Sequence, residues 1–442
     1  MPTTPSNEES AGENADEEPD GDHGQEPARD GPYAVFGIVS YRDYTFGSLA
    51  TRMGTRLQSV AMGWDVYQRT GEPLALGLVG LIQVIPAILL ALPAGWLADR
   101  YDRQRIILFS LAGMTLTSFG LALQSWAEAP IATLYLLLFI DAIAGTMGRP
   151  ARTAILPRIV PRRLFPRAVT WNFTLFQLAA VIGPGVGGFV VAWSIPAAYV
   201  IAAISSALFA LVVLRLPAGC GVPETSTGED VSSNTPLSTL FDGVRYVWRT
   251  RVLLAILSLD MFAVLLGGAV FLLPIFAEEI LRVGATGLGW LHAAPAVGAL
   301  LTALVMTHLP PLPRAGRALL GCVGGFGVAT IIFGFSTNLP LSLVMLFLTG
   351  AFDQVSMVVR HTMVQLITPD AMRGRVSAVN GVFVSTSNEL GGFESGLVAH
   401  WFGPVVSVVS GGVGTILVVL VTTVASGQLR RFGSLANIQP RM

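Results

Sequence analysis

The sequence predicts an all-α integral membrane protein with twelve transmembrane helices in two pseudo-symmetric six-helix bundles. Three observations predict this fold: an apolar composition, a series of long apolar stretches, and a repeat that relates the two halves. Of the 442 residues, 52% are hydrophobic and only 12% are charged, whereas a typical soluble domain has about 25% charged residues. Water alone cannot solvate so long and so apolar a chain, so we expect a lipid bilayer to cover most of its surface.

Twelve apolar stretches follow the N-terminal segment, and each is long enough to cross a hydrocarbon core about 30 Å thick. They lie at about 44–67, 76–97, 106–126, 131–148, 170–192, 196–216, 252–276, 286–307, 317–336, 340–358, 376–400 and 404–425. The segments on one side of these stretches hold 23 arginines, whereas those on the other side hold only Arg69 and Arg282. By the positive-inside rule, both termini are therefore expected in the cytoplasm.

The two halves of the chain are related by an offset of 208 residues. Six identities share it: Arg152 with Arg360, Pro161 with Pro369, Arg167 with Arg375, Asn172 with Asn380, Gly183 with Gly391, and Gly188 with Gly396. These identities indicate that a six-helix unit was duplicated. In transporters with parallel repeats of this kind, the binding site lies between the halves, near the middle of the bilayer.

The composition changes along the chain predict five segments. They are a disordered acidic cytoplasmic tail at 1–32, an N-terminal bundle at 33–216, a cytoplasmic linker at 217–251, a C-terminal bundle at 252–425 and a cytoplasmic tail at 426–442. The first 30 residues contain ten of the 28 acidic residues and no apolar run, which is typical of disorder. The linker ends in an amphipathic pattern, and we interpret it as a tether that could also lie on the membrane surface.

Several functional classes are excluded by the residue types that the chain lacks. All 27 basic residues are arginine, which excludes a P-loop lysine and a Schiff-base lysine and is typical of a GC-rich bacterial genome. Cys220 and Cys322 have neither metal-ligand spacing nor a disulfide framework. No HExxH or GxSxG motif is present. We therefore expect no enzyme activity, no metal, no cofactor and no nucleic-acid partner.

Charged residues inside the predicted spans are the candidates for a transport pathway. Each costs about 2.5–3.5 kcal/mol on insertion and is kept where it faces protein or water. Arg52 and Arg56 belong to a polar stripe on the first span, which also contains Thr45, Ser48, Thr55, Ser59 and Gly63. The carboxylates are Asp141, Asp260, Asp353, Glu389 and Glu394. We interpret these charged groups as the substrate and proton pathway.

The carboxylates are candidates for proton coupling. Burial favours the protonated form of a carboxylate, and a nearby arginine opposes this, so a changing distance to Arg52 or Arg56 would couple protonation to conformation. The repeat offset pairs Asp260 with Arg52, and we predict that they approach each other across a central cavity. Asp260 and Asp141 rank first as coupling residues and Glu389 next, whereas His292 is interpreted as a packing residue.

The segment after the second span carries a recognisable cluster, which reads Gly95-Trp-Leu-Ala-Asp99-Arg100-Tyr-Asp102-Arg103-Gln-Arg105. A glycine allows two helices to approach closely, and the aspartate and arginines can form charge-assisted hydrogen bonds to neighbouring helices. We predict that Gly95, Asp99, Arg100, Arg103 and Arg105 form a latch at the cytoplasmic face. The run resembles the signature between the second and third helices of the major facilitator superfamily.

Two further stretches narrow this resemblance. Gly183-Pro184-Gly185-Val-Gly187-Gly188 is similar to the fifth-helix motif of antiporters in the superfamily, although Thr170 and Ala179 replace glycines of the full pattern. Most of the chain resembles the enterobactin-exporter branch, the transmembrane secretion effector group. The matching stretches are His361 to Gly411, Leu273-Pro274 with Phe276-Ala277, and Ala293-Ala294-Pro295 with Gly298-Ala299. Members of that branch export siderophores, macrolides and other amphipathic compounds in exchange for protons.

Taken with the residues, the resemblance implies a proton-coupled exporter that works by alternating access as a monomer in the bacterial inner membrane. The resemblance also implies that the polar stripe of the first span lines an aqueous cavity. The expected cargo is siderophore-like or otherwise amphipathic, and two arginines in the cavity favour an anion. The alternatives are broad multidrug or macrolide efflux, proton-coupled uptake, and a receptor or scaffold that has lost transport. The glycines at 183–188 disfavour uptake, and the charges kept inside the spans disfavour a scaffold.

Overall fold

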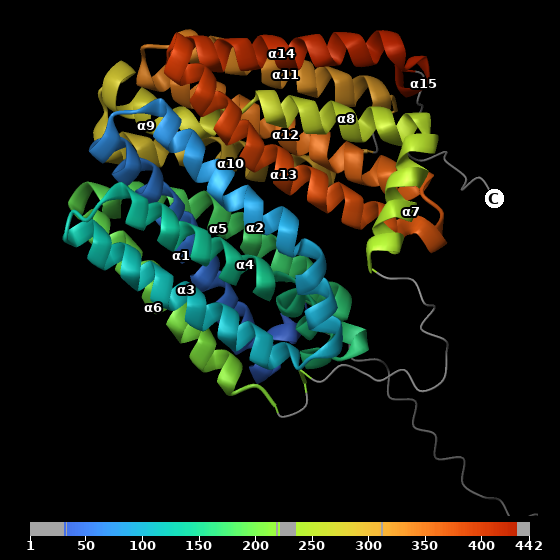
Figure 1. The fold of residues 1–442 in the computed structure, drawn as a ribbon. Helices are drawn as coiled ribbons and strands as arrows, with labels where there is room; N and C mark the ends of the chain where they lie inside the picture. Colours follow the sequence, from blue (N-terminus) through green and yellow to red (C-terminus); the bar gives the residue numbers. More distant parts are fainter. Residues whose placement is uncertain (1–30, 32, 218–219, 222–235, 311–312, 431–442) are drawn as a thin grey trace, which may run out of the picture.

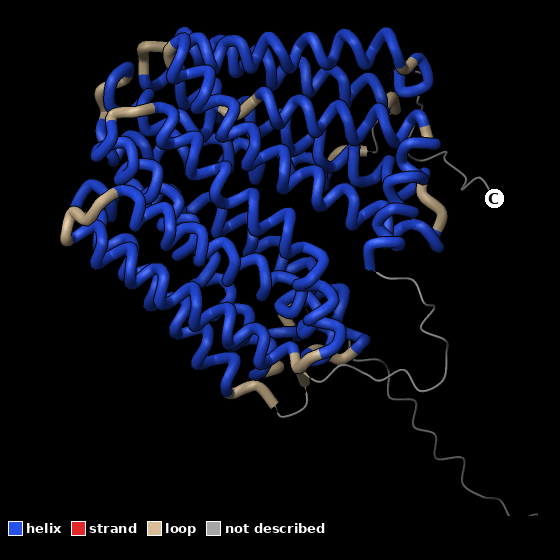
Figure 2. Tube along the Cα trace, in the orientation of Figure 1, coloured by secondary structure: helices blue, strands red, loops and turns tan. Residues whose placement is uncertain are grey.

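The computed structural model describes residues 31, 33–217, 220–221, 236–310 and 313–430, and nearly all of both predicted tails lies outside these residues. Every regular element in the described part is a helix (Figure 2). The N-terminal bundle consists of α1 (Val39–Thr70), α2 (Pro73–Arg100), α3 (Arg103–Trp126), α4 (Ile131–Ile159), α5 (Phe165–Trp193) and α6 (Ile195–Leu214). The C-terminal bundle consists of α8 (Arg251–Leu266), α9 (Leu273–Ile275), α10 (Gly284–His308), α11 (Ala315–Phe335), α12 (Leu339–Ile367), α13 (Asp370–Phe402) and α14 (Pro404–Ala425).

Short helices complete the fold. The linker helix α7 (Pro236–Arg249) precedes the C-terminal bundle, and α15 (Gly427–Arg430) follows it. Single turns η1 (Ala34–Gly37) and η2 (Arg162–Leu164) precede α1 and α5. Ten helical stretches among the described residues are long and apolar enough to cross a membrane. The other two predicted spans correspond to α1 and α13, which are 32 and 33 residues long; α1 carries Arg52 and Arg56, and α13 carries Glu389 and Glu394.

The internal repeat is visible in the positions of the helices. Adding 208 to Ile131 and Ile159, the ends of α4, gives Leu339 and Ile367, the ends of α12. The end of α2 at Arg100 corresponds in the same way to the end of α10 at His308. The duplication predicted from six identities therefore extends to the placement of whole helices.

The two bundles touch along two helix pairs, α2 with α13 and α5 with α10. They lie together at one end of the molecule and diverge toward the other end, which carries α7 (Figure 1). We call these the closed end and the α7 end. Glycines make the contact at the closed end: a Cβ atom on Gly396 would lie 2.6 Å from the Cα atom of Gly77, and one on Gly188 would overlap Gly289. Small residues of this kind allow helix backbones to meet.

The seventh span is interrupted, which corrects the prediction of one continuous helix at 252–276. Helix α8 ends at Leu266, and Gly267 and Gly268 separate it from η3 (Ala269–Leu272), α9 and the π-helical turn η4 (Phe276–Ile280). Glycines at the break have little cost in an unwound backbone. The last carbonyl oxygens of α8 face the backbone of neighbouring helices, because Gly391 and Gly411 leave no side chain between them.

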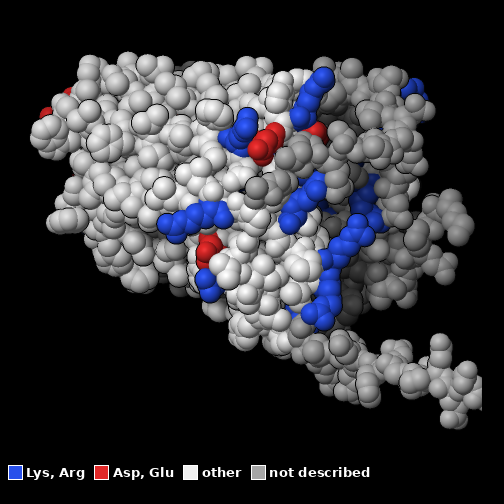
Figure 3. All heavy atoms as spheres, turned by 90° about the horizontal axis from the view of Figure 1, so that it is seen from below, with Lys and Arg blue, Asp and Glu red and all other residues white. Residues whose placement is uncertain are grey.

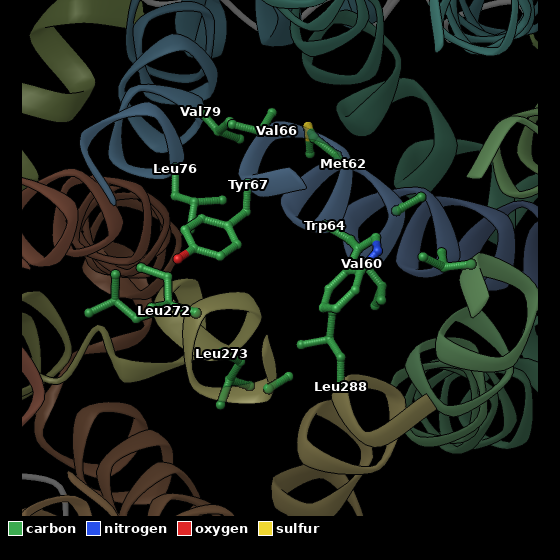
Figure 4. Close-up of a cluster of buried hydrophobic side chains, with 14 of the residues drawn as sticks. Val60, Met62, Trp64, Val66, Tyr67, Leu76, Val79, Leu272, Leu273 and Leu288 are labelled. Carbon is green, nitrogen blue, oxygen red and sulfur yellow. The ribbon is translucent and has the colours of Figure 1, made fainter. Parts of the chain in front are cut away.

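The two parts of the seventh span, before and after the break, are buried in different hydrophobic clusters. Helix α8 is buried in a core of the C-terminal bundle alone, through residues such as Leu253 and Ile256. The segment after the break is instead buried in a cluster at the closed end, which we call the cross-bundle core and which includes Leu76, Leu272 and Leu273. Figure 4 shows side chains of both bundles meeting there. The second half of the seventh span thus packs against the N-terminal bundle.

Helix α7 packs against the C-terminal bundle (Figure 1). Val247 is fully buried in the core of that bundle, and Asp242 forms an ion pair of 3.1 Å with Arg375 of α13. A Cβ atom on Gly243 would lie 2.9 Å from the carbonyl oxygen of Arg375. Trp248 remains exposed. The linker helix is therefore held against the C-terminal bundle.

Candidate functional site

The polar stripe of α1 divides into two parts. Thr45 and Ser48 are buried, whereas Thr55, Arg56 and Ser59 are exposed. The expectation that the whole stripe lines an aqueous cavity is therefore wrong for its first part, because that part packs inside the N-terminal bundle. Exposed polar side chains remain only on the second part.

Arg52 lies between the two parts of the stripe. Its Nε atom donates a hydrogen bond of 3.2 Å to Ser48 Oγ. The guanidinium carbon lies 5.3 Å from the ring centroid of Phe176 on α5, within the range of a cation–π interaction. Arg52 is thus held by two partners of its own bundle.

Arg56 faces the opposite bundle. It lies within electrostatic range of two groups there, Glu389 of α13 and His292 of α10, and Glu389 is also within range of Arg149 of α4. Arg56 has no hydrogen-bond partner among the described residues, and Glu389 Oε2 is buried without one. Gly183 gives Arg56 its space, since a Cβ atom there would lie 2.7 Å from Arg56 Cβ. Arg56 and Glu389 therefore carry opposite charges on opposite bundles.

Asp260 is paired within its own bundle, which corrects the predicted approach to Arg52. It forms an ion pair with Arg360 of α12, and both side chains are buried. Asp260 also borders a small cavity of about 20 Å³, lined in addition by Asp353 and Ser356, which is large enough for about one water molecule. Asp353 itself is exposed and has no hydrogen-bond partner among the residues described.

The remaining two predicted carboxylates have local partners. Asp141 accepts hydrogen bonds from Thr117 Oγ1 at 2.6 Å and from Gln58 Nε2 at 3.4 Å, so it joins α4 to α3 and α1 inside the N-terminal bundle. Glu394 accepts a hydrogen bond of 3.5 Å from Ser395. Of the five carboxylates, Glu389 is therefore the one that faces arginines of the other bundle.

The predicted latch after α2 does not bridge the bundles in this conformation. Asp99 is exposed and has no partner in the described part of the chain, and no atom lies within 4 Å of a Cβ built on Gly95. The expected close helix approach at Gly95 is therefore absent while the α7 end is apart. Arg103 instead donates to the carbonyl oxygens of Ala98 and Ala154, at 3.1 and 3.3 Å.

The other arginines of the cluster have local contacts. Arg100 lies over the ring of Trp96, 5.5 Å from its centroid. Arg105 lies 3.7 Å from Asp102, which caps α3 by accepting a hydrogen bond from the backbone of Gln104. Figure 3 shows arginines gathered over the middle and the right of one face, toward the α7 end.

The glycine motif of α5 lies in the bundle interface. A Cβ atom on Gly187 would lie 3.2 Å from the Cα atom of Leu57. Gly188 faces Gly289 across the interface, and Pro184 lies inside the helix. A Cβ atom on Gly185 would make an ordinary van der Waals contact, 3.8 Å from Ala293 Cβ. The motif therefore brings α5 against α1 on one side and α10 on the other.

Sequence reasoning missed the polar contacts at the closed end. Tyr67 donates a hydrogen bond to Glu279, and Glu72 contacts His400 at 3.1 Å. These residues lie at the ends of predicted spans, and their types alone do not indicate which would meet. The sequence signal that these four residues share is their position at or just beyond the ends of predicted spans.

The arrangement of two bundles around charged side chains suits binding and a change of conformation. Among the described residues, no group of three or more potential ligands is placed to hold a metal ion. Asp141 and Asp260 are held inside their own bundles, whereas Arg56 and Glu389 lie on opposite bundles.

Comparisons with known proteins agree with this architecture. The sequence is 29% identical over 366 residues to the multidrug efflux pump Tap of Mycolicibacterium fortuitum, covering 80% of this chain and 88% of that protein. It is 28% identical over 344 residues to the enterobactin exporter EntS of Escherichia coli O1:K1, covering 76% and 80%.

Solved structures share the fold at low identity. A bacterial homologue of the human lysosomal transporter Spinster, in an inward-facing and unoccupied conformation, matches with a TM-score of 0.65 and 15% identity, covering 88% of this chain and 95% of that chain. The nucleoside transporter NupG matches with a TM-score of 0.69 and 13% identity, covering 87% and 99%. The family described as transmembrane secretion effector matches residues 30–439. The chain therefore belongs to this family of major facilitator transporters.

Proposed function

We propose that this transporter is a proton-coupled exporter of an amphipathic organic molecule, with its α7 end in the cytoplasm. One observation carries the proposal: the bundles are joined at one end by glycine contacts between backbones and apart at the other, with Arg56 and Glu389 facing each other between them. A protein that exposes its binding site to alternate sides needs such an interface. The arginines at the α7 end support the orientation.

Glu389 is the carboxylate best placed to couple protons to transport. It lies on one bundle, and its neighbouring charges, Arg56 and Arg149, lie on the other. When the bundles rock, the distance to these arginines changes, and with it the affinity of the carboxylate for a proton. Asp260 and Asp141, which ranked higher from sequence, have partners within their own bundles, so rocking leaves their surroundings largely unchanged.

The driving force is sufficient for this mechanism. One proton that crosses a potential of ~100 mV releases about 2.3 kcal/mol, and each pH unit adds about 1.4 kcal/mol. Expelling a neutral solute against a hundredfold gradient requires about 2.7 kcal/mol. One proton per molecule is therefore enough at ordinary gradients, and an anionic cargo is helped further by a negative interior.

The relatives and the charges at the interface both indicate the class of cargo. EntS-like relatives support a siderophore-like molecule, and Arg52, Arg56 and Arg149 at the interface suit an anion. The similarity to Tap supports the alternative of multidrug efflux, and the ring of Phe176 beside Arg52 suits an aromatic group in either cargo.

The test uses inside-out membrane vesicles that contain the protein. A catecholate siderophore and a macrolide are added outside, the lumen is made acidic, and accumulation of each compound is measured. We expect accumulation that a protonophore abolishes, greater for the siderophore; greater accumulation of the macrolide would favour the alternative. Accumulation of neither compound above vesicles lacking the protein would contradict export of both classes.

A further inference from the structure

We propose that two polar contacts at the closed end, Tyr67–Glu279 and Glu72–His400, form a lock that holds the transporter in the conformation open at the α7 end. The inference rests on the alternating access of the proposed function and goes beyond it, because it assigns residues that set the balance between the two states. Each contact takes one partner from each bundle. Both must break before the closed end can open.

The first contact joins α1 to the π-helical turn η4. The hydroxyl of Tyr67 donates to a carboxylate oxygen of Glu279. The ring of Tyr67 is buried in the cross-bundle core, where Figure 4 shows it between Leu76 and Leu272. The carboxylate of Glu279 is exposed. Because packing fixes the buried Tyr67 ring, only the side chain of Glu279 has to be ordered when the hydrogen bond forms.

The second contact joins the beginning of α2 to the end of α13. Glu72 is the residue before α2, and its Oε2 atom lies 3.1 Å from Nδ1 of His400. Both side chains are well exposed, by 57% and 39%. Exposed pairs are weaker than buried ones because water and salt screen them. Tyr67–Glu279 is therefore the stronger element of the lock.

The glycine contacts bring the bundles together by backbone packing alone and place no hydrogen-bonding side chain across the interface. The two polar contacts have a different character, because their partners lie at helix ends on the closed side alone. They favour the state in which the closed end is shut. Among the described residues, Asp99 at the α7 end has no partner that would favour the other state.

The break in the seventh span places Glu279 on a separate segment. The residues from Ala269 to Ile280 follow Gly267 and Gly268 and pack in the cross-bundle core, while α8 packs in the core of its own bundle. The carboxylate of the lock is thus carried by the part of the C-terminal bundle that adheres to the N-terminal bundle. Losing the Tyr67 hydroxyl weakens that adhesion directly.

The experiment measures distances across both ends of the full-length protein in lipid nanodiscs. Spin labels are placed at Ala127→Cys and Thr337→Cys for the closed end, and at Leu214→Cys and Val424→Cys for the α7 end, after both native cysteines are replaced. These four positions are exposed and take no part in the lock. Pulsed electron resonance then gives the fraction of molecules in each state.

The critical variant is Tyr67→Phe, which removes only the hydroxyl. A hydrogen bond to a charged group is stronger than one between neutral groups, so we expect at least a tenfold rise in the ratio of molecules open at the closed end, with a matching decrease at the α7 end. Glu279→Ala should give the same shift. Glu279→Gln keeps an acceptor and should give a smaller one. His400→Gln should shift the ratio by about threefold, as exposed pairs are weak.

The matched control is Tyr135→Phe. The hydroxyl of Tyr135 on α4 donates to the carbonyl oxygen of Ala75 on α2 at 3.0 Å, near the same end but within one bundle, so its loss should not move the ratio. Unchanged ratios in the folded Tyr67→Phe and Glu279→Ala proteins would overturn the lock. If the wild type changes both distances reciprocally on addition of cargo, the proposed function survives that result; if no protein ever changes them, both fail.

Discussion

At the scale of single residues, the charges inside the spans act mainly through the partners that each finds. The positions of these charges could be predicted from sequence, because an ionised group in an apolar stretch is costly and stands out. Their partners could not. Asp260 and Arg52 are equivalent positions of the repeat, and such positions lie in different bundles; Arg360, within the same bundle as Asp260, is close enough to pair with it.

This pairing predicts a stability effect for Asp260. Replacing it with Asn leaves the charge of Arg360 buried and uncompensated, which typically costs about 3–5 kcal/mol. We expect the Asp260→Asn protein to unfold at a clearly lower temperature than the wild type in detergent, followed by intrinsic fluorescence. Adding Arg360→Gln should recover part of the loss, because the unpaired charge is removed.

The control for this comparison is Asp43→Asn. Asp43 pairs with its neighbour Arg42 at 3.1 Å, and both side chains are about half exposed, so its loss should leave the unfolding temperature nearly unchanged. If Asp260→Asn were as stable as Asp43→Asn, the ion pair would not support the C-terminal bundle.

At the scale of helices, the sequence predicts the spans well because length and hydropathy determine them. The break in the seventh span was missed, since Gly267, Gly268 and Pro274 occur inside an otherwise apolar stretch and hydropathy does not detect backbone conformation. The crossing of α5 with α10 was missed as a specific contact for a related reason. A glycine motif indicates close packing, but the partner depends on the arrangement of both bundles.

The glycine crossing gives a prediction at this scale. A Cβ atom on Gly188 would overlap the backbone of Gly289, whereas one on Gly185 would make only an ordinary contact, 3.8 Å from Ala293 Cβ. Overpacking of a tight contact costs about 1–3 kcal/mol, so Gly188→Ala should force the closed end apart. We expect a single cysteine at Leu272, buried in the cross-bundle core, to react faster with a maleimide in that variant.

The comparison is with Gly185→Ala on the same helix, one turn away. This variant should leave the rate of the Leu272→Cys reaction as it is in the parent protein. Equal rates in both alanine variants would show that the crossing of α5 and α10 does not control access to the closed end.

At the scale of the whole molecule, the protein combines a duplicated fold with an unequal distribution of charge. The duplication and the two-bundle architecture could be predicted from six identities and twelve apolar stretches, and the family match agrees with them. The conformation could not be predicted, because one sequence must support states open at either end. With the α7 end apart, Asp99 has no partner among the described residues, and Arg56 and Glu389 lie on opposite bundles within electrostatic range.

Proton flux in liposomes that contain the purified protein tests whether Glu389 couples protons to transport. A pH-sensitive dye is trapped inside, a pH gradient is imposed, and the cargo identified in vesicles is added. Wild-type protein and Asp43→Asn should release protons only when cargo is present, and Glu389→Gln should lose this flux while remaining folded. Cargo-dependent flux that persists undiminished in Glu389→Gln would contradict the coupling proposed here.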